Sequence, residues 1–218
     1  ETVLVQNWLK ALPEELIRAR PLLCAVYASC IMLVSRGFVK SAETSMLIER
    51  WLQDAETAMT VQSKSPSSDK PLDHAAVHYV AKVRAYLAQS RGEDPQTIIV
   101  LSRQALERLP KDELWFRSAF AHNLGVAYLR LGDRNAARDS FEQARRTGEV
   151  SHDLFNASSA IYYQALLAHM EGRLHEAAAI CREGLQSMSD LAEGRSVPYS
   201  GAIYIALGSV LSEWGQFE

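Results

Sequence analysis

A glycine recurs through this 218-residue chain at nearly regular intervals, each time after an apolar segment of helical length. These glycines are Gly37, Gly92, Gly132, Gly172 and Gly215, at spacings of 55, 40, 40 and 43 residues. A glycine just past a helix takes up a left-handed backbone conformation at little cost, which lets the chain reverse tightly. Self-similarity at this period is typical of stacked helical hairpins that cover each other's apolar faces. The chain is therefore predicted to be all-α.

A small residue stands five positions after four of these glycines, at Ala42, Thr97, Ala137 and Ala177. A small side chain there lets the second helix of a hairpin lie close against the first. We therefore expect a right-handed superhelix of stacked antiparallel helix hairpins, each with its turn at one of the glycines.

The third unit carries the most specific pattern, which consists of Leu124-Gly125-x-x-Tyr128, Gly132, Ala137, Phe141 and Ala144. This spacing resembles that of the tetratricopeptide repeat (TPR). We expect Gly125 to allow close approach of the two helices, and Tyr128 and Phe141 to fill the core between them. The fifth unit repeats the start of the pattern, with Leu207-Gly208-x-x-Leu211 and then Gly215.

The register of the repeats predicts a single helical-repeat domain over residues 1–218. Its units are a lead-in at about 1–20, then 21–60, 72–110, 114–150, 154–190 and a truncated unit at 199–218. The long first spacing has a visible cause in a polar Ser/Pro-rich segment from Ser63 to Pro71, which neither helix nor strand favours. We predict a mobile loop over residues 62–71, inside one array rather than between two domains.

Charge and composition exclude several classes of function. The chain has 23 Lys and Arg against 26 Asp and Glu, a net charge of −3, so it lacks the basic excess that direct binding of nucleic acid requires. Its longest uncharged runs are too short to span a bilayer, and no signal peptide is evident. The three cysteines, Cys24, Cys30 and Cys181, form no CxxC pair and favour a reducing, cytoplasmic setting.

Motifs for catalysis are missing from the sequence. It holds no phosphate-binding loop and no nucleophile elbow, and His175-Glu176 lacks the second histidine of a zinc-hydrolase helix. His74 and His78 lie one helical turn apart and could reach one metal ion, but no third ligand stands nearby. A solvated helix start is the simpler interpretation of this pair. We therefore predict no enzymatic activity, no cofactor and no bound metal.

The residues that face the groove of such an array come from the first helix of each hairpin. Counting back from each turn glycine gives the polar and aromatic positions of this face: Tyr27, Tyr79, Lys82, Tyr86, Gln89, His122, Asn123, Tyr162, Tyr163, His169 and Ser209. Such a wall suits a sugar, another small polar metabolite or a peptide. A structural role is equally open, in which Tyr79 and Tyr86 pack the hairpin and Asn123 follows the ordinary repeat consensus.

The first fifty residues carry a family resemblance. The pattern comprises Trp8-Leu9-x-x-Leu12-Pro13-x-Glu15, Arg20-Pro21-x-Leu23-Cys24-x-x-x-Ala28, Gly37, Ala42-Glu43 and Leu47. It resembles the opening of the helical-repeat region in large ATP-dependent, maltose-regulon-activator-like transcriptional regulators of the LuxR family. The following units are similar too, so the resemblance covers nearly all of the chain. Since the first residue is Glu1 and not Met, and the last, Glu218, follows Gly-Gln-Phe with no stop signal, we expect the sequence to be part of a longer polypeptide.

This resemblance implies the sensor region of a bacterial regulator that also has an N-terminal nucleotide-switch ATPase and a C-terminal helix-turn-helix. Inducers and inhibitory partners would act on the sensor, and inducer and ATP together would drive self-association and promoter binding. DNA would be contacted only by the C-terminal domain, and no contact with a membrane is implied. The resemblance carries over no ligand-binding residues, because these positions share no motif with this sequence.

Two hypotheses for function follow. The first is a non-catalytic, effector-sensing module whose concave groove binds a small polar ligand or a partner and regulates the ATPase and DNA-binding domains outside this sequence. The second is a generic scaffold that binds a protein or peptide and senses no small molecule.

Overall fold

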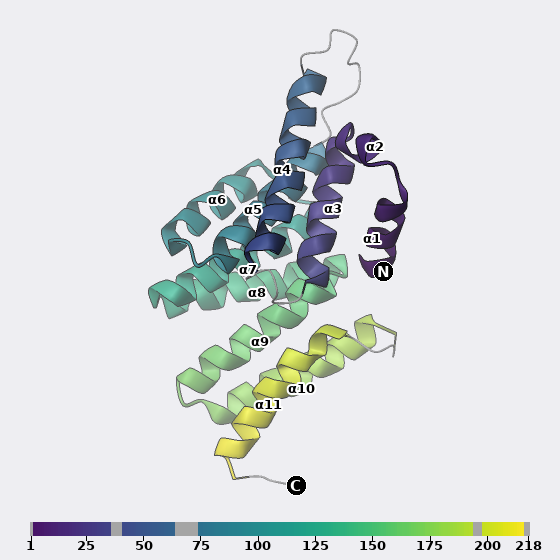
Figure 1. Cartoon of the computed structure of the whole chain (residues 1–218). Coiled ribbons are helices and arrows are strands. Elements are labelled where there is room, and N and C mark those ends of the chain that lie inside the picture. The colour runs from purple at the N-terminus through teal and green to yellow at the C-terminus, as the bar shows by residue number, and fades with distance from the viewer. Residues whose placement is uncertain (1, 36–40, 64–73, 194–197, 216–218) are drawn as a thin grey trace. The chain divides into compact units, whose positions relative to one another are not determined.

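The computed structural model describes residues 2–35, 41–63, 74–193 and 198–215. Within these ranges the chain forms helices and no strand, which confirms the all-α prediction. The elements are α1 (Thr2–Ala11), α2 (Glu14–Arg18), α3 (Pro21–Val34), α4 (Ala42–Ser63), α5 (His74–Ser90), α6 (Pro95–Arg108), α7 (Leu114–Leu131), α8 (Arg134–Ser151), α9 (Leu154–Met170), α10 (Leu174–Leu191), the short 3-10 helix η2 (Pro198–Ser200) and α11 (Gly201–Glu213) (Figure 1).

Backbone contacts divide the chain into two compact units. We call Glu1–Thr97 the N-terminal unit and Ile98–Glu218 the C-terminal unit, and the division lies in the first turn of α6. Each unit is described separately below.

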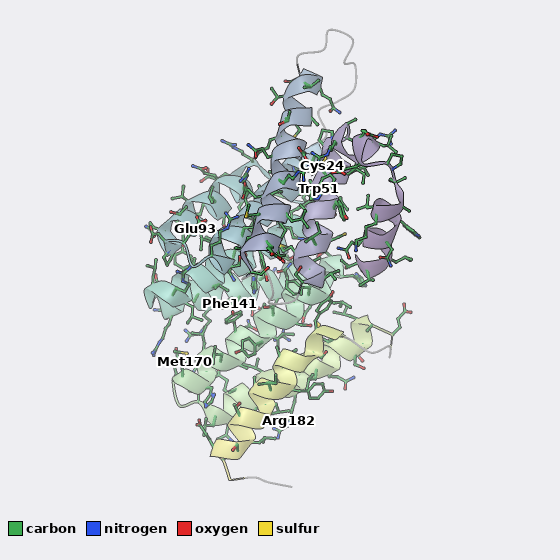
Figure 2. All side chains as sticks on the ribbon, viewed as in Figure 1. Cys24, Trp51, Glu93, Phe141, Met170 and Arg182 are labelled. Atoms are coloured by element: carbon green, nitrogen blue, oxygen red, sulfur yellow. The ribbon has the colours of Figure 1, made fainter. Side chains whose placement is uncertain are left out.

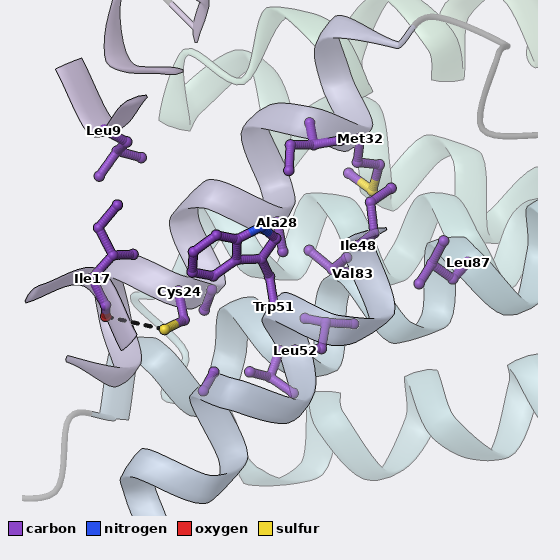
Figure 3. Close-up of a cluster of buried hydrophobic side chains, with 14 residues drawn as sticks. Leu9, Ile17, Cys24, Ala28, Met32, Ile48, Trp51, Leu52, Val83 and Leu87 are labelled. Atoms are coloured by element: carbon purple, nitrogen blue, oxygen red, sulfur yellow. Dashed lines mark hydrogen bonds between the residues drawn. The ribbon is translucent and has the colours of Figure 1, made fainter. Parts of the chain in front are cut away.

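In the N-terminal unit, α3 is the central helix and packs against α1, α2, α4 and α5. Its sequence is almost entirely apolar, and Pro21 occupies its first turn, where the missing N–H leaves no hydrogen bond unmade. Figure 3 shows how Cys24 and Ala28 of α3 meet Trp51 and Leu52 of α4 in the core. These side chains form one continuous apolar cluster, which is the main source of stability in this unit.

The cysteines of the described chain are free and buried. The Cys24 thiol donates a hydrogen bond to the carbonyl oxygen of Ile17 at 3.1 Å (Figure 3), and burial raises its pKa to about 11. Burial also raises the pKa of the Cys181 thiol to about 11. Both thiols therefore stay protonated and unreactive, as expected of small core residues.

The C-terminal unit is built from hairpins. α7 packs against α8, α9 packs against α8 and α10, and α11 packs against α9 and α10 (Figure 1). Gly132, which ends α7, and Gly172, which follows α9, have φ angles of 79° and 74°. Gly92 and Gly215 also have positive φ, so four of the five predicted turn glycines adopt the left-handed conformation. Gly37 lies outside the described residues.

The close approach predicted at Gly125 is confirmed. A Cβ atom built on Gly125 would lie 2.5 Å from the ring of Phe141. Phe141, a residue of α8 labelled in Figure 2, is fully buried. Tyr128 packs against the same cluster. The absence of a side chain at Gly125 therefore makes the notch that this ring occupies.

The prediction for the small residue after each glycine is right in two units and wrong in two. Ala137 and Ala177 are fully buried against the first helix of their hairpins. Ala42 and Thr97 are exposed, and the next residues along the chain to be buried are Ser45 and Ile98. In these two units the buried stripe of the second helix is shifted, because it follows the apolar residues and not the distance from the glycine.

Gln62 and Ser63, which the sequence analysis placed in the predicted loop at 62–71, are the last residues of α4. The rest of that segment lies outside the described residues.

Candidate ligand-binding face

The eleven predicted groove residues fall in both units. Tyr27 lies on α3, and Tyr79, Lys82, Tyr86 and Gln89 lie on α5 in the N-terminal unit. The C-terminal unit holds the other six: His122 and Asn123 on α7, Tyr162, Tyr163 and His169 on α9, and Ser209 on α11. All eleven are on first helices of the predicted hairpins, and a groove shared by the two units stays a prediction.

The three tyrosines of the N-terminal unit are half-buried and pack against its apolar core. The Tyr27 ring lies 4.8 Å from the Trp51 ring between centroids, and burial raises the pKa of the Tyr86 hydroxyl. Tyr79 and Tyr86 therefore have the structural role considered for them, which is to pack against the core. A role for them in binding ligand stays a prediction.

Lys82, expected to project into the groove, is only 5% exposed. Its ammonium lies 5.8 Å from the centre of the Tyr79 ring. Its positive charge lowers the pKa of the nearby Cys30 thiol, although burial of that thiol is the larger effect and raises it. The long apolar stem of lysine makes such burial feasible. Lys82 is thus part of the packed interior of this unit rather than an exposed cation.

In the C-terminal unit the structure gathers predicted residues from α7 and α9. His122 is 4% exposed, and its Nε2 lies 2.8 Å from Oγ of Ser159. Its ring centre lies 5.7 Å from that of Tyr163, which stacks on Phe141 at 4.8 Å with nearly parallel planes. Tyr162 meets Tyr163 edge to face at 5.1 Å. We call these five residues, His122, Phe141, Ser159, Tyr162 and Tyr163, the His122 cluster.

His122 is neutral at physiological pH. Burial lowers its pKa to about 4, although the Asp153 carboxylate and a hydrogen bond with Asn123 act in the opposite direction. A neutral imidazole has one donor and one acceptor nitrogen. Ser159, Tyr162 and Tyr163 are half-buried, so the cluster combines a buried polar base with partly accessible aromatic rings and hydroxyls.

The depressed pKa of His122 makes stability depend on pH. Between about pH 6.5 and about pH 4 the unfolded chain binds a proton at His122 that the folded chain does not bind, so the free energy of unfolding falls as the pH falls. The slope reaches up to about 1.4 kcal/mol per pH unit. Urea unfolding at about pH 7 and about pH 5 measures this loss. His122→Gln should reduce the loss, and an unchanged loss in this variant would contradict the assignment.

A second buried polar group, which the sequence analysis missed, lies at the start of α9. Asp153 is the N-cap of this helix and accepts a hydrogen bond from the Asn156 backbone N–H at 3.2 Å. Its other carboxylate oxygen accepts from Oγ of Ser118 on α7 and from Nδ2 of Asn156, both at 2.7 Å. The Asp-x-x-Asn sequence signals the cap, but Ser118 is 35 residues away. The carboxylate therefore fixes α9 to α7 beside the His122 cluster.

Removal of this carboxylate should be more harmful than removal of an ordinary cap. Asp153→Ala leaves the Asn156 side-chain amide buried without this acceptor and leaves the Ser118 hydroxyl only the Trp115 carbonyl oxygen as a partner, and we expect a loss of about 2–3 kcal/mol in the free energy of unfolding. Asp133 caps α8 in the same way but is exposed, accepting from the Ala136 backbone N–H at 3.0 Å. Asp133→Ala should cost about 1 kcal/mol. Equal losses in urea unfolding would show that the contact with Ser118 contributes nothing.

Three predicted residues of the C-terminal unit are not members of the His122 cluster. Asn123 is buried and bonds to the neighbouring His122. His169 pairs instead with Glu213 of α11, with Nε2 2.9 Å from Oε1. Ser209 is exposed, and its hydroxyl donates to the Ile205 carbonyl at 3.0 Å. The His169–Glu213 pair is therefore a separate polar contact between α9 and α11.

A hollow of about 560 Å³ lies elsewhere on the C-terminal unit. It is lined by Leu114 of α7 and by Asp139, Glu142, Gln143, Arg146, Thr147 and Val150 of α8. These residues belong mostly to the solvent-facing side of a second helix, and none of them is a predicted groove residue.

The described part of the chain shows no group of three or more His, Cys, Asp or Glu side chains arranged to hold a metal ion. Nor does any helix there have the length and apolar character needed to cross a membrane.

A comparison with known families shows to which family this chain belongs. The family model described as the MalT-like TPR region matches residues 78–218, which is more than half of the chain. The chain belongs to the MalT-like TPR family. No curated protein matches it. The match begins within α5 and includes the whole C-terminal unit with the His122 cluster. The residues that carry the family resemblance in the first fifty positions lie before this region. The sequence analysis extended the resemblance to the following units, and the match to residues 78–218 confirms it there.

Proposed function

We propose that this MalT-like TPR chain is the effector-sensing region of a LuxR-type transcriptional regulator, and that it binds a small, uncharged polar ligand at the His122 cluster. The match to the MalT-like TPR region is the observation that carries the proposal. That family is one of helical sensor or interaction regions in MalT-type regulators.

The chemistry of the cluster supports an uncharged ligand. Its members are aromatic rings, hydroxyls and an imidazole that burial keeps neutral. None of the five side chains carries a charge at pH 7, so a charged ligand would be desolvated there without an opposite charge in the cluster. Aromatic faces with hydroxyl groups at their edges suit a ligand that is itself partly apolar and rich in hydrogen-bonding groups.

Transmission of the signal would depend on the thermodynamic linkage between ligand binding and the conformation of the regulator. A ligand changes the equilibrium between two conformations of a regulator only if it binds one more tightly than the other. The cluster joins two helices of successive hairpins through the His122–Ser159 hydrogen bond, so a ligand that replaces this bond changes how α7 and α9 pack. In this proposal the region is non-catalytic, needs no cofactor, and acts in the cytoplasm on ATPase and DNA-binding domains elsewhere in the regulator.

A thermal-shift screen of uncharged polar metabolites against the 218-residue chain tests the proposal. A ligand at 100 times its dissociation constant should add about 2.7 kcal/mol to the stability of the folded state. Tyr162→Leu should weaken binding of any hit. The matched control is Tyr199→Leu, since Tyr199 contacts Phe155 at 5.2 Å and is not in the cluster.

Two outcomes would contradict the proposal. A hit whose affinity is unchanged in Tyr162→Leu binds elsewhere. Silence across the screen, combined with binding of a peptide or protein partner, would favour the alternative of a generic TPR scaffold.

A further inference from the structure

The hollow on α8 has a chemistry that the proposed ligand site does not use. Six of its lining residues stand at positions 139, 142, 143, 146, 147 and 150, a spacing that places them on one side of the helix. The opposite side of α8 carries Ala137, Phe141 and Ala144, which are fully buried. Together with Leu114 at the start of α7, these six residues line what we call the α8 hollow.

The charged side chains of α8 differ in whether they have partners. Outside the hollow, the Arg138 guanidinium lies 2.8 Å from a carboxylate oxygen of Glu171. Inside the hollow, Asp139 and Arg146 are exposed and form no ion pair or side-chain hydrogen bond with any other described residue. Two opposite charges that do not pair with each other therefore face one concave space.

The α8 hollow changes its chemistry along the helix. Its first part carries the carboxylates of Asp139 and Glu142, its middle the guanidinium of Arg146, and its last part the apolar side chain of Val150. Leu114 adds to the apolar end, because the start of α7 lies beside the end of α8 in an antiparallel hairpin. The hollow therefore offers an acidic, a basic and an apolar region in that order.

These three regions have the spacing of side chains on one face of an extended peptide. At about 1.5 Å per residue, the centre of the acidic region lies about 8 Å along the helix axis from Arg146, and Arg146 lies about 6 Å from Val150. In an extended chain, side chains two residues apart point to the same side and are about 6.5–7 Å apart. Three alternate residues of such a chain can therefore reach the three regions at once.

The width of the hollow favours an extended chain over a helix. Residues 139–150 cover about 16 Å of the helix axis. A volume of about 560 Å³ over this length gives a mean width of about 6 Å. A helix with its side chains is about 10–12 Å across, whereas strands lie side by side at about 4.7–4.9 Å. The hollow therefore accommodates an extended segment but not a helix.

We propose that the α8 hollow binds an extended segment of a partner protein whose alternate residues are basic, acidic and apolar. The basic side chain pairs with Asp139 and Glu142, and Nε2 of Gln164 holds the Glu142 carboxylate in place by donating to it at 2.8 Å. The acidic side chain accepts two hydrogen bonds from the Arg146 guanidinium, the planar arrangement that arginine and carboxylate favour. The apolar side chain covers Val150, which is 67% exposed.

This site is separate from the His122 cluster. The two share only α8, which contributes Phe141 to the cluster from its buried side and lines the hollow with its exposed side. Binding of a segment at the hollow and binding of a ligand at the cluster therefore succeed or fail independently.

Fluorescence anisotropy of labelled, capped heptapeptides with the 218-residue chain tests the proposal. One peptide has Lys, Glu and Leu at its second, fourth and sixth positions with Thr elsewhere, and the other has them in reverse order, so that both directions of the segment are tested. One of the two should bind with a dissociation constant below about 1 mM. Arg146→Glu should raise this constant about fivefold or more, because it replaces an attraction with a repulsion. Absence of binding by both peptides at about 1 mM would overturn the proposal.

Arg182→Glu is the matched control. Arg182, labelled in Figure 2, is an exposed residue of α10 outside the hollow, so its reversal changes the net charge equally and should leave the dissociation constant unchanged. Replacing the central Glu of the peptide by Lys should weaken binding to the original chain and restore it in Arg146→Glu but not in Arg182→Glu. Thermal unfolding checks that both variants are folded. Equal effects of the two reversals, or no restoration in Arg146→Glu, would contradict the proposal.

Discussion

Gly125→Leu is expected to lower the free energy of unfolding of the C-terminal unit by about 3 kcal/mol, near the upper end of overpacking effects. Even a Cβ atom at this position would lie 2.5 Å from the Phe141 ring. That ring is fully buried and stacks on Tyr163 behind it, so it has no free space into which it can move. The leucine therefore separates α7 from α8. Urea unfolding followed by circular dichroism measures the loss.

Gly208→Leu is the matched control, because Gly208 has the same place in α11 and an added Cβ there meets no atom within 4 Å. This change should leave stability unchanged or raise it by up to about 1 kcal/mol, since leucine is a better helix former than glycine. Similar effects of the two substitutions would mean that the register of the hairpins is wrong.

Phe141→Ala is expected to cost about 3–5 kcal/mol, the usual range for removal of a buried phenylalanine. The ring fills the notch at Gly125, stacks on Tyr163 and lies 6.0 Å from the His122 ring. Its loss leaves a cavity between α7, α8 and α9 at the base of the His122 cluster. The measurement is again urea unfolding of the purified chain. A loss below about 1 kcal/mol would show that the ring is not the centre of the core.

The effects of Gly125→Leu and Phe141→Ala on stability should also be coupled. Leucine at position 125 can occupy part of the space that Phe141→Ala vacates, so the double variant should be less destabilised than the sum of the single variants, by about 1 kcal/mol or more. Additive losses would mean that the two side chains do not share one space, contrary to the close contact at Gly125.

The sequence allowed prediction of the features that depend on local backbone chemistry. Gly132 and Gly172 end their helices in the left-handed conformation, and only glycine adopts this conformation without strain. The notch at Gly125 was predictable for a related reason, because a glycine nearly two turns before the end of a long apolar helix has no local use other than close packing.

Features that depend on distant residues were not predictable. The periodicity of α5 gives the face on which Lys82 lies, but the depth of its burial depends on how the other helices cover it. The Asp153–Ser118 contact joins positions 35 residues apart, and no spacing rule relates them. Ala42 and Thr97 were assigned to the packed side from their distance to a glycine, yet the apolar stripes of α4 and α6 begin elsewhere.

The candidate ligand-binding face was predictable only in part, because its contacts also depend on residues of different helices. Register alone placed His122, Tyr162 and Tyr163 on first helices, and the structure brings them together. The partner of His122 is Ser159, and register within one helix does not show which side chains of two different helices meet. The neutrality of His122 arises from burial between helices, which a single helix cannot reveal.

Hydrogen–deuterium exchange of the 218-residue chain, with and without each metabolite that raises its melting temperature, tests the central claim most directly. Ligand contact at the His122 cluster predicts slower exchange in α7 around His122 and in α9 from Ser159 to Tyr163, with α3 and α5 unchanged. Slower exchange confined to α3 and α5, or to the solvent-facing side of α8, would contradict the account.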